Sequence, residues 1–224
     1  MWNRRNRIRC KRGKGLYAVI AGIAVLFIFV IAILVCAITE WMHGGEEAPF
    51  DENVTPPDIQ ERFLTPNEYS RPGTALSEVH GIVIHYTANP GTDAVANRNY
   101  FDNLPVINRK QKNKTYASSH FVIGIEGEIV QCIPLNEIAY ASNDRNADTV
   151  SIECCHKKKN GKFTKRTYSS LLELTTYLCK RYRLSEKNVI RHYDVTEKNC
   201  PKYFVEHEDA WHRFLSDVAA ELKK

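Results

Sequence analysis

The pattern of apolar positions divides the chain after residue 60 into alternating strands and helices. Short β-branched runs bounded by turn residues predict strands, and apolar residues recurring every three or four positions predict amphipathic helices. Strands are expected at 80–88, 148–155 and 188–194, a hairpin at 119–135 around Glu126-Gly127, and helices at 92–104, 167–184 and 207–222. Because strands alternate with helices, the expected fold class is α/β, a mixed central β-sheet flanked by helices.

Each predicted helix presents one apolar face to that sheet. In the helix at 92–104, Thr92 is a candidate N-cap, and Ala96, Tyr100 and Leu104 share a face. The inward positions of the two later helices are Leu171, Leu174, Leu178 and Tyr182, and then Trp211, Leu215, Val218 and Leu222.

The N-terminal part of the chain has a different pattern. Residues 16–38 are 23 residues without a charge, and at about 1.5 Å per residue they would span the roughly 30 Å of bilayer hydrocarbon. Seven basic residues and no acid precede them, which favours a cytoplasmic N-terminus. The sequence thus predicts a single-pass cell-membrane protein: a basic cytoplasmic tail (1–15), a transmembrane helix (16–38), a proline-containing extracellular linker (39–60) and an extracellular domain (61–224).

A cleaved secretory signal is the alternative interpretation of the same run. Such signals have an apolar region of about 7–15 residues followed by a small-residue cleavage site. The run here is longer, and Val35-Cys36-Ala37 is a poor cleavage site. An uncleaved anchor is therefore preferred.

This topology changes the meaning of the net charge of +5. All 26 acids lie after residue 39, together with 24 of the 31 basic residues, so the external part has a net charge of −2. No basic stripe indicates a nucleic-acid partner, and the sequence indicates no particular oligomeric state.

The external part has five cysteines, at positions 132, 154, 155, 179 and 200. An odd number leaves at least one thiol outside any disulfide. On a strand, adjacent Cys154 and Cys155 would point to opposite faces, and both are interpreted as small buried hydrophobic residues.

Two histidines and a cysteine lie where predicted strands end. His85 is near the end of the strand at 80–88, His192 is near the end of the strand at 188–194, and Cys200 follows eight residues later. Sites in open α/β sheets gather beyond the carboxyl ends of strands. Two imidazole nitrogens and a thiolate are zinc donors that leave a fourth position for water. The chain has eight histidines, so a histidine can lie at a strand end by chance. The alternative for both His85 and His192 is therefore a hydrogen-bonded surface residue.

Glu153 and Lys198 are the candidate catalytic residues. A carboxylate in the apolar strand at 148–155 is costly to bury alone, so it faces a cleft or meets a cation. Near zinc it could take a proton from metal-bound water and pass it to the leaving amine. Lys198 could place its ammonium beside a developing oxyanion. The alternatives are a strand-edge salt bridge for Glu153 and a solvated loop charge for Lys198.

Four stretches together resemble the zinc-dependent N-acetylmuramoyl-L-alanine amidase family, which includes phage endolysin amidases and peptidoglycan-recognition proteins. They are IVIHYTANPG (82–91), SSHFVIGIEGEIVQCIPLNEIAY (118–140), DTVSIECC (148–155) and RHYDVTEKNCP (191–201). The resemblance implies that His85, His192 and Cys200 bind Zn²⁺. It implies that Glu153 is the acid/base carboxylate and that Lys198 stabilises the transition state.

Together with the anchor predicted at 16–38, the resemblance implies a membrane-anchored cell-wall hydrolase. The implied reaction is hydrolysis of the amide between the lactyl group of N-acetylmuramic acid and L-alanine in peptidoglycan, and the implied fold is a mixed sheet flanked by helices. The alternative is a non-catalytic peptidoglycan-binding module, which would fit better if a zinc ligand were missing.

Three positions depart from the family pattern. Ser119 stands where many relatives have a tyrosine. This removes one candidate proton donor and favours Glu153 in that role. Tyr140-Ala141 replaces a Trp-His pair, which would remove a ring from the expected substrate groove. Glu197 stands at a usual glycine.

Overall fold

The computed structural model describes residues 20, 22–23, 27, 30–31, 51 and 53–224. The chain divides into two compact units, residues 1–45 and 46–224, and the second holds the α/β domain. The predicted tail at 1–15, most of the predicted transmembrane helix at 16–38 and most of the predicted linker lie outside the described residues. Among the described residues, no helix combines the length and apolar character needed to cross a membrane.

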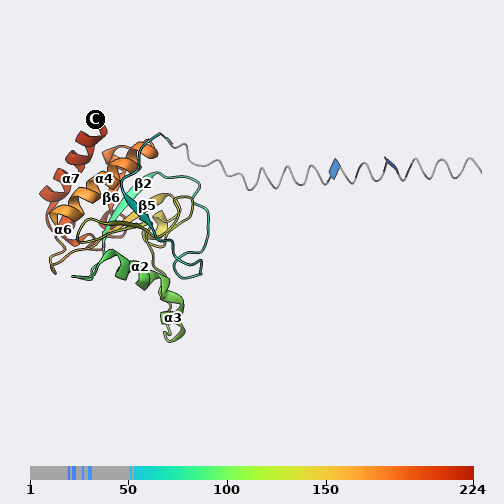
Figure 1. Ribbon diagram of the computed structural model, residues 1–224, viewed down its shortest axis with the longest axis horizontal. Coiled ribbons are helices and arrows are strands. Elements are labelled where there is room, and N and C mark those ends of the chain that lie inside the picture. The colour runs from blue at the N-terminus through green and yellow to red at the C-terminus, as the bar shows by residue number, and fades with distance from the viewer. Residues whose placement is uncertain (1–19, 21, 24–26, 28–29, 32–50, 52) are drawn as a thin grey trace, which may run out of the picture. The chain divides into compact units, whose positions relative to one another are not determined.

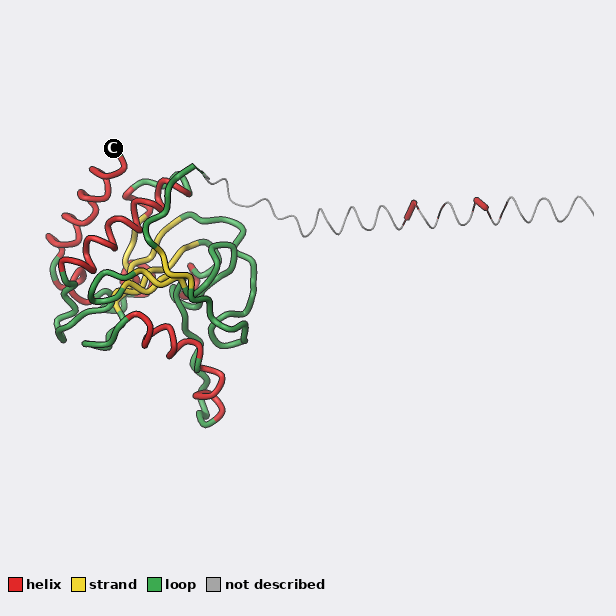
Figure 2. The backbone as a smooth tube through the Cα atoms, viewed as in Figure 1, coloured by secondary structure: helices red, strands yellow, loops and turns green. Residues whose placement is uncertain are grey.

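In the described residues, six strands form one mixed sheet in the order β1-β4-β3-β5-β2-β6. The strands lie in the middle of the domain (Figure 1, Figure 2). They are β1 (Ile59–Glu61), β2 (Gly81–Tyr86), β3 (Phe121–Ile123), β4 (Ile129–Gln131), β5 (Thr149–Cys154) and β6 (Val189–Arg191). Neighbouring strands are parallel, except in the β3–β4 hairpin. The predicted mixed sheet is confirmed. Its edge strand β1 begins at Ile59, inside the range assigned to the linker.

Helices cover both faces of the sheet. They are α2 (Ala94–Asp102), α3 (Leu104–Arg109), α4 (Lys165–Arg181), α5 (His192–Thr196), α6 (Lys202–Glu206) and α7 (Glu208–Leu222), with short 3₁₀ turns η1 (Asn143–Arg145) and η2 (Glu186–Asn188). Figure 1 shows α4 and α7 on one side of the strands and α2 on the other. The sheet is therefore the middle layer of a helix–sheet–helix arrangement.

Alternation along the strands builds two cores, one on each face of the sheet. On β2, Ile82 and Ile84 enter the core under α4 and α7. Residues of α4 and α7 that pack there include the predicted Leu171, Leu174, Leu178, Trp211 and Val218. Cys154 lies in this core and Cys155 in the one under α2, which confirms their opposite directions. All five cysteines of the described domain are buried free thiols.

The predicted inward face of the first helix is wrong at Ala96 and Tyr100, which are exposed, and right at Leu104, which is buried at the start of α3. Asp93, not Thr92, is the N-cap, because its carboxylate accepts the Ala96 N–H at 2.7 Å. Tyr100 is 47% exposed, whereas Asn97 and Phe101 are buried. A polar residue can face the core here because the Asn97 amide is hydrogen-bonded to the backbone carbonyl of Asp93 at 2.7 Å. The spacing of apolar residues alone therefore predicts the wrong buried face for α2.

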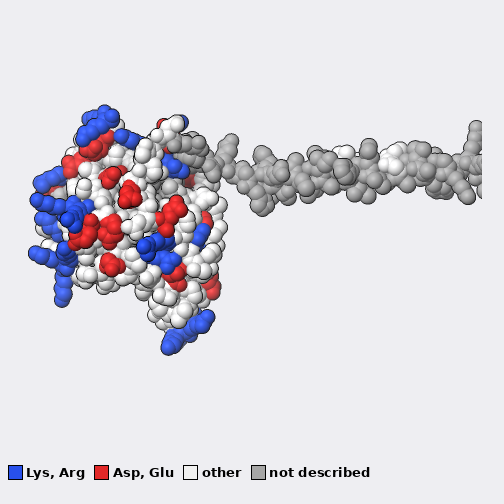
Figure 3. Space-filling model, in the orientation of Figure 1, with Lys and Arg blue, Asp and Glu red and all other residues white. Residues whose placement is uncertain are grey.

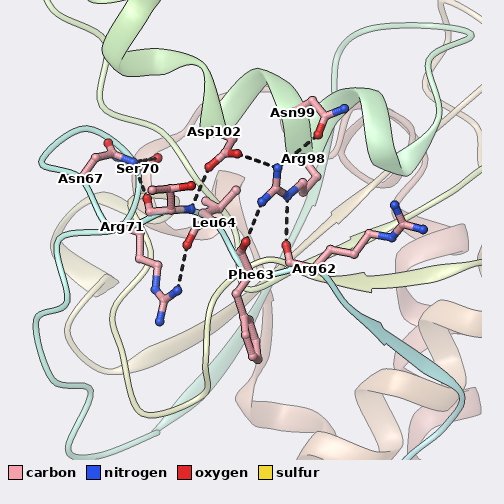
Figure 4. A network of polar contacts seen from close by, with 10 residues as sticks. Arg62, Phe63, Leu64, Asn67, Ser70, Arg71, Arg98, Asn99 and Asp102 are labelled. Carbon is pink, nitrogen blue, oxygen red and sulfur yellow. Dashed lines mark hydrogen bonds and ion pairs between the residues drawn. The ribbon is translucent and has the colours of Figure 1, made fainter.

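A polar network fixes α2 to the chain that follows β1 (Figure 4). Arg98 donates to the carbonyl oxygens of Arg62 at 3.0 Å and Phe63 at 2.6 Å, and it forms an ion pair with Asp102 at 2.7 Å. Asp102 also accepts the Thr65 N–H at 2.8 Å. These bonds hold the helix that carries Phe101 in place beside the sheet.

Charge on the domain surface is mixed. On the face seen in Figure 3, basic and acidic side chains are interspersed, and a basic group stands at the end of α3. Arg109, Lys110 and Lys112 are exposed in this region.

His120, just before β3, is a buried histidine with both ring nitrogens in use. Its Nδ1 accepts the Ser151 N–H at 3.0 Å and its Nε2 donates to the Glu137 carbonyl oxygen at 3.0 Å. The ring is therefore neutral, and burial lowers its pKa to about 4.

Folding stability should consequently fall in acid. Because the folded pKa of His120 is below the unfolded value of about 6.5, its contribution is complete above pH 6.5 and is lost as the pH falls towards 4. Denaturant unfolding should show a loss of about 2 kcal/mol from this group between about pH 7.5 and about pH 5. The loss should be absent in His120→Gln and unchanged in a variant of the exposed His80. An equal acid loss in His120→Gln would contradict the assignment.

Candidate metal centre

The sheet register places the candidate residues at one end of three neighbouring strands. His85 of β2 pairs with Glu153 of β5, so both side chains point to the α2 face of the sheet. β6 pairs with the other side of β2, and His192 is the first residue of α5, directly after β6. Cys200 follows α5. This is the carboxyl end of parallel strands, where α/β proteins place their sites.

The three predicted ligands lie within reach of one ion. The donor atoms of His85, His192 and Cys200 are all within 4.8 Å of one another. Nδ1 of His85 is 3.9 Å from Sγ of Cys200, and the two imidazole centroids are 4.6 Å apart. The three side chains are buried, with exposed fractions of 2%, 6% and 2%. They are thus not the separate surface residues of the alternative interpretation.

The electrostatics of these residues suit a soft divalent cation. Burial, the neighbouring His192 and the charge of Lys198 lower the pKa of His85 well below its usual value, and burial also lowers the pKa of His192. Burial raises the pKa of the Cys200 thiol to about 12. Without a cation the cluster therefore consists of two neutral imidazoles and a thiol, whose proton a metal would displace.

An orphan nitrogen shows where a ligand fits. Nδ1 of His192 is sealed from solvent and has no hydrogen-bond partner, while its Nε2 bonds to Oδ1 of Asn143 at 3.1 Å. Buried polar atoms are normally paired, and coordination to a metal would pair this one. Two imidazole nitrogens and a thiolate match the donor set of zinc sites. The residues present therefore fit such an ion.

Glu153 and Lys198 share a cleft with these ligands. The cleft has a volume of about 410 Å³ and is lined by all five predicted site residues. Oε2 of Glu153 is buried without a partner, and burial raises the pKa of this carboxyl to about 7, against the lowering effect of Lys198. No ion pair involves Glu153 in the described part of the chain, so the strand-edge salt bridge does not form.

Comparison with known proteins identifies the family. The family model described as N-acetylmuramoyl-L-alanine amidase matches residues 75–203, more than half of the chain. The chain belongs to this family. The predicted resemblance is therefore confirmed, and the matched range contains every candidate ligand.

Curated amidases match across most of the domain. The N-acetylmuramoyl-L-alanine amidase CwlL of Bacillus licheniformis is 37% identical over 159 residues, which are 66% of this chain and 42% of CwlL. The amidase BlyA of Bacillus subtilis strain 168 is 32% identical over 181 residues, 71% of this chain and 46% of BlyA. The chain thus spans less than half the length of these relatives.

Solved structures share the fold. The catalytic domain of XlyA is 27% identical, with a TM-score of 0.58 over 72% of this chain and 99% of that domain. PlyL is 23% identical, with a TM-score of 0.60 over 72% of this chain and 97% of PlyL. The likeness to PlyL shows the fold alone.

The departures from the amidase pattern have structural explanations. The Ser119 hydroxyl is buried and donates to the Phe121 carbonyl oxygen at 2.9 Å, so it contributes no proton donor to the cleft. Tyr140 lines the cleft and meets Tyr116 edge-on at 5.9 Å. Tyr140 and the half-exposed Tyr116 thus supply aromatic rings to the groove, while Ala141 has none.

Glu197 explains why this amidase position favours glycine. It ends α5 with φ 60° and ψ 7°, in the left-handed region. Side chains with a Cβ are disfavoured there by roughly 1 kcal/mol or more, and only glycine adopts the conformation freely.

Replacing Glu197 by glycine should therefore stabilise the domain. Relief of the left-handed strain is partly offset by the greater freedom of glycine in the unfolded chain, which leaves a gain of about 0.5–1 kcal/mol. Glu197→Ala should show no such gain, because alanine keeps the Cβ. Denaturant midpoints of the three proteins measure the effect, and a destabilised glycine variant would contradict it.

The sequence did not indicate the residues that hydrogen-bond to the two candidate histidine ligands without being ligands themselves. Ser142 and Asn143 lie in the turn between β4 and β5, and each bonds to one candidate ligand. Their only signal in the sequence is a short polar stretch, which predicts a turn but gives no indication of what it contacts.

Proposed function

We propose that the chain is a zinc-dependent N-acetylmuramoyl-L-alanine amidase that acts on peptidoglycan at the outer face of the cell membrane. The observation that carries the proposal is the grouping of three buried metal donors with a carboxyl whose Oε2 is buried and unpaired, and with the ammonium of Lys198, in one cleft. Membership of the amidase family supports the bond that is cut: the amide between the lactyl group of N-acetylmuramic acid and L-alanine.

His85, His192 and Cys200 would hold the zinc ion. A zinc ion in such a site supplies Lewis acidity towards water and towards the oxygen of the scissile carbonyl. The site keeps room for substrate because the cleft opens beside the three ligands.

Glu153 moves the proton in this proposal. A carboxyl with a pKa of about 7 is present in both protonation states near neutral pH, which suits a group that accepts a proton and then donates it. The carboxylate takes a proton from the attacking water, and the resulting acid donates it to the amine of L-alanine as the amide bond breaks.

Lys198 stabilises negative charge on the carbonyl oxygen of the scissile amide in this proposal. Its side chain is exposed, lines the cleft and lowers the pKa of Glu153 and the two histidines. The ammonium is therefore close enough to act on negative charge that develops on the carbonyl oxygen. Tyr116 and Tyr140 offer ring faces to the sugar or peptide on the cleft wall.

A peptidoglycan digest tests the proposal. The full chain, purified in detergent, should contain about one zinc per molecule and should release peptides with new L-alanine amino termini from isolated cell walls. Zinc content near zero would overturn the hydrolase. Binding to the walls without release would favour the non-catalytic recognition module.

The membrane location rests on residues 16–38 and the basic residues that precede them. An uncleaved anchor predicts that the protein stays in the membrane pellet after alkaline extraction, at its full mass. It also predicts that protease added to cells stripped of their wall removes the domain. Release by alkali, or loss of the N-terminal residues from the isolated protein, would overturn this part of the proposal.

A further inference from the structure

We infer that the turn at residues 141–146 is a clamp that fixes both histidines of the metal centre in the ring tautomer that binds metal. Ser142 and Asn143 are its positioning residues. This inference rests on the proposed metal centre and adds to it the groups that set the direction and protonation of its ligands.

The clamp reaches two ligands that come from different elements. Oγ of Ser142 is 3.2 Å from Nε2 of His85, which lies on β2. Oδ1 of Asn143 is 3.1 Å from Nε2 of His192, which begins α5. Consecutive residues of one turn thus contact Nε2 of both rings, and at His85 the other ring nitrogen, Nδ1, lies 3.9 Å from Sγ of Cys200.

The turn is itself held rigid by a third side chain. Oδ1 of Asn146 accepts the N–H groups of Ala141 at 3.0 Å and Ser142 at 2.6 Å. Ser142 is buried, and its hydroxyl bonds to His85 alone among the described residues. Asn143 adopts φ 52°, a left-handed conformation that asparagine tolerates better than most residues.

The chemistry of the acceptors decides the tautomer. An amide oxygen can only accept a hydrogen bond, so Nε2 of His192 carries the hydrogen and Nδ1 keeps a lone pair. Nδ1 of His192 is the buried nitrogen of the metal centre that has no hydrogen-bond partner. At His85, the Ser142 hydroxyl accepts from Nε2–H when Nδ1 is the ligand atom. Such outer contacts orient the ring of a metal-bound histidine and raise its basicity.

The experiment separates the side-chain contact from the backbone of the turn. Asn143→Gly keeps the left-handed conformation but removes the acceptor, Asn143→Asp keeps an acceptor oxygen, and Ser142→Ala removes the hydroxyl. Asp144→Asn is the matched control, because this exposed neighbour is not among the hydrogen-bond partners of either histidine in the described residues. All are made in the full chain, and unfolding curves of the zinc-free proteins establish that each variant is folded.

Two measurements are made on each protein. Competition with a chromophoric chelator gives the dissociation constant for zinc, and long-range ¹H–¹⁵N spectra of the imidazoles give the tautomers in the zinc-free state. We expect zinc affinity to fall by about 10- to 100-fold in Asn143→Gly and Ser142→Ala, with Asn143→Asp and Asp144→Asn close to the parent protein. We also expect His192 to be the Nε2–H tautomer in the parent and a mixture in Asn143→Gly.

Unchanged zinc affinity and tautomer in Asn143→Gly and Ser142→Ala would overturn the clamp while leaving the metal centre intact. The opposite result is also distinguishable. If the parent protein bound no zinc but its His192 tautomer still depended on Asn143, the clamp would stand and the proposed function would fall.

Discussion

Replacement of Glu153 by glutamine should lower the rate of peptide release from peptidoglycan by about 10²- to 10⁴-fold, the usual contribution of a positioned general acid–base group. The amide has nearly the shape of the carboxyl but can neither accept the proton of the attacking water nor return it to the amine. Zinc content should stay at one per chain, because Glu153 is not among the three clustered donors. Release is followed by the appearance of free L-alanine amino termini.

The glutamine variant should also fold at least as well as the parent protein. Oε2 of Glu153 is buried without a hydrogen-bond partner, so ionisation of this carboxyl is unfavourable in the fold. Glu126→Gln is the matched control, because this glutamate is exposed at the β3–β4 turn and should leave the rate unchanged. Full activity of Glu153→Gln would show that the proton is carried by another group.

The general layout of the fold could be predicted because its elements have strong local patterns. The buried run of β2 and the apolar face of α4 are each visible in a short window of sequence. The first helix shows where such patterns mislead. Asn97 lies on the buried face of α2 only because nearby groups satisfy its amide, and that compensation is a tertiary property.

Some residues of the candidate site could likewise be predicted from local patterns, and others could not. His85 and Glu153 could be placed together because each lies on a predicted strand, although their direct pairing depends on strand order, which the pattern does not contain. Ser142 and Asn143 could not be found, because the turn that carries them has no periodic pattern. The role of Glu197 was equally hidden, since a left-handed φ at a helix end is set by how the chain turns from α5 towards Cys200.

Replacement of Cys200 by alanine should remove both zinc and activity. The variant keeps two neutral imidazoles but loses the only donor that becomes negatively charged on metal binding, and catalytic zinc sites use three protein ligands. Metal analysis after gel filtration should find zinc far below one per chain, and release of L-alanine amino termini should fall to the level of untreated walls. This outcome differs from that of Glu153→Gln, which keeps its zinc.

Stability measurements give a second signature of the same loss. Zinc present at 100 times its dissociation constant should stabilise the parent protein by about 2.7 kcal/mol, and it should leave Cys200→Ala unchanged. Cys179→Ala is the matched control, because Cys179 is an equally buried thiol in the core under α4. That variant loses packing but should keep its zinc, its activity and its response to the metal. One zinc per chain in Cys200→Ala would show that the thiol is not a ligand and that the ion is held by other groups.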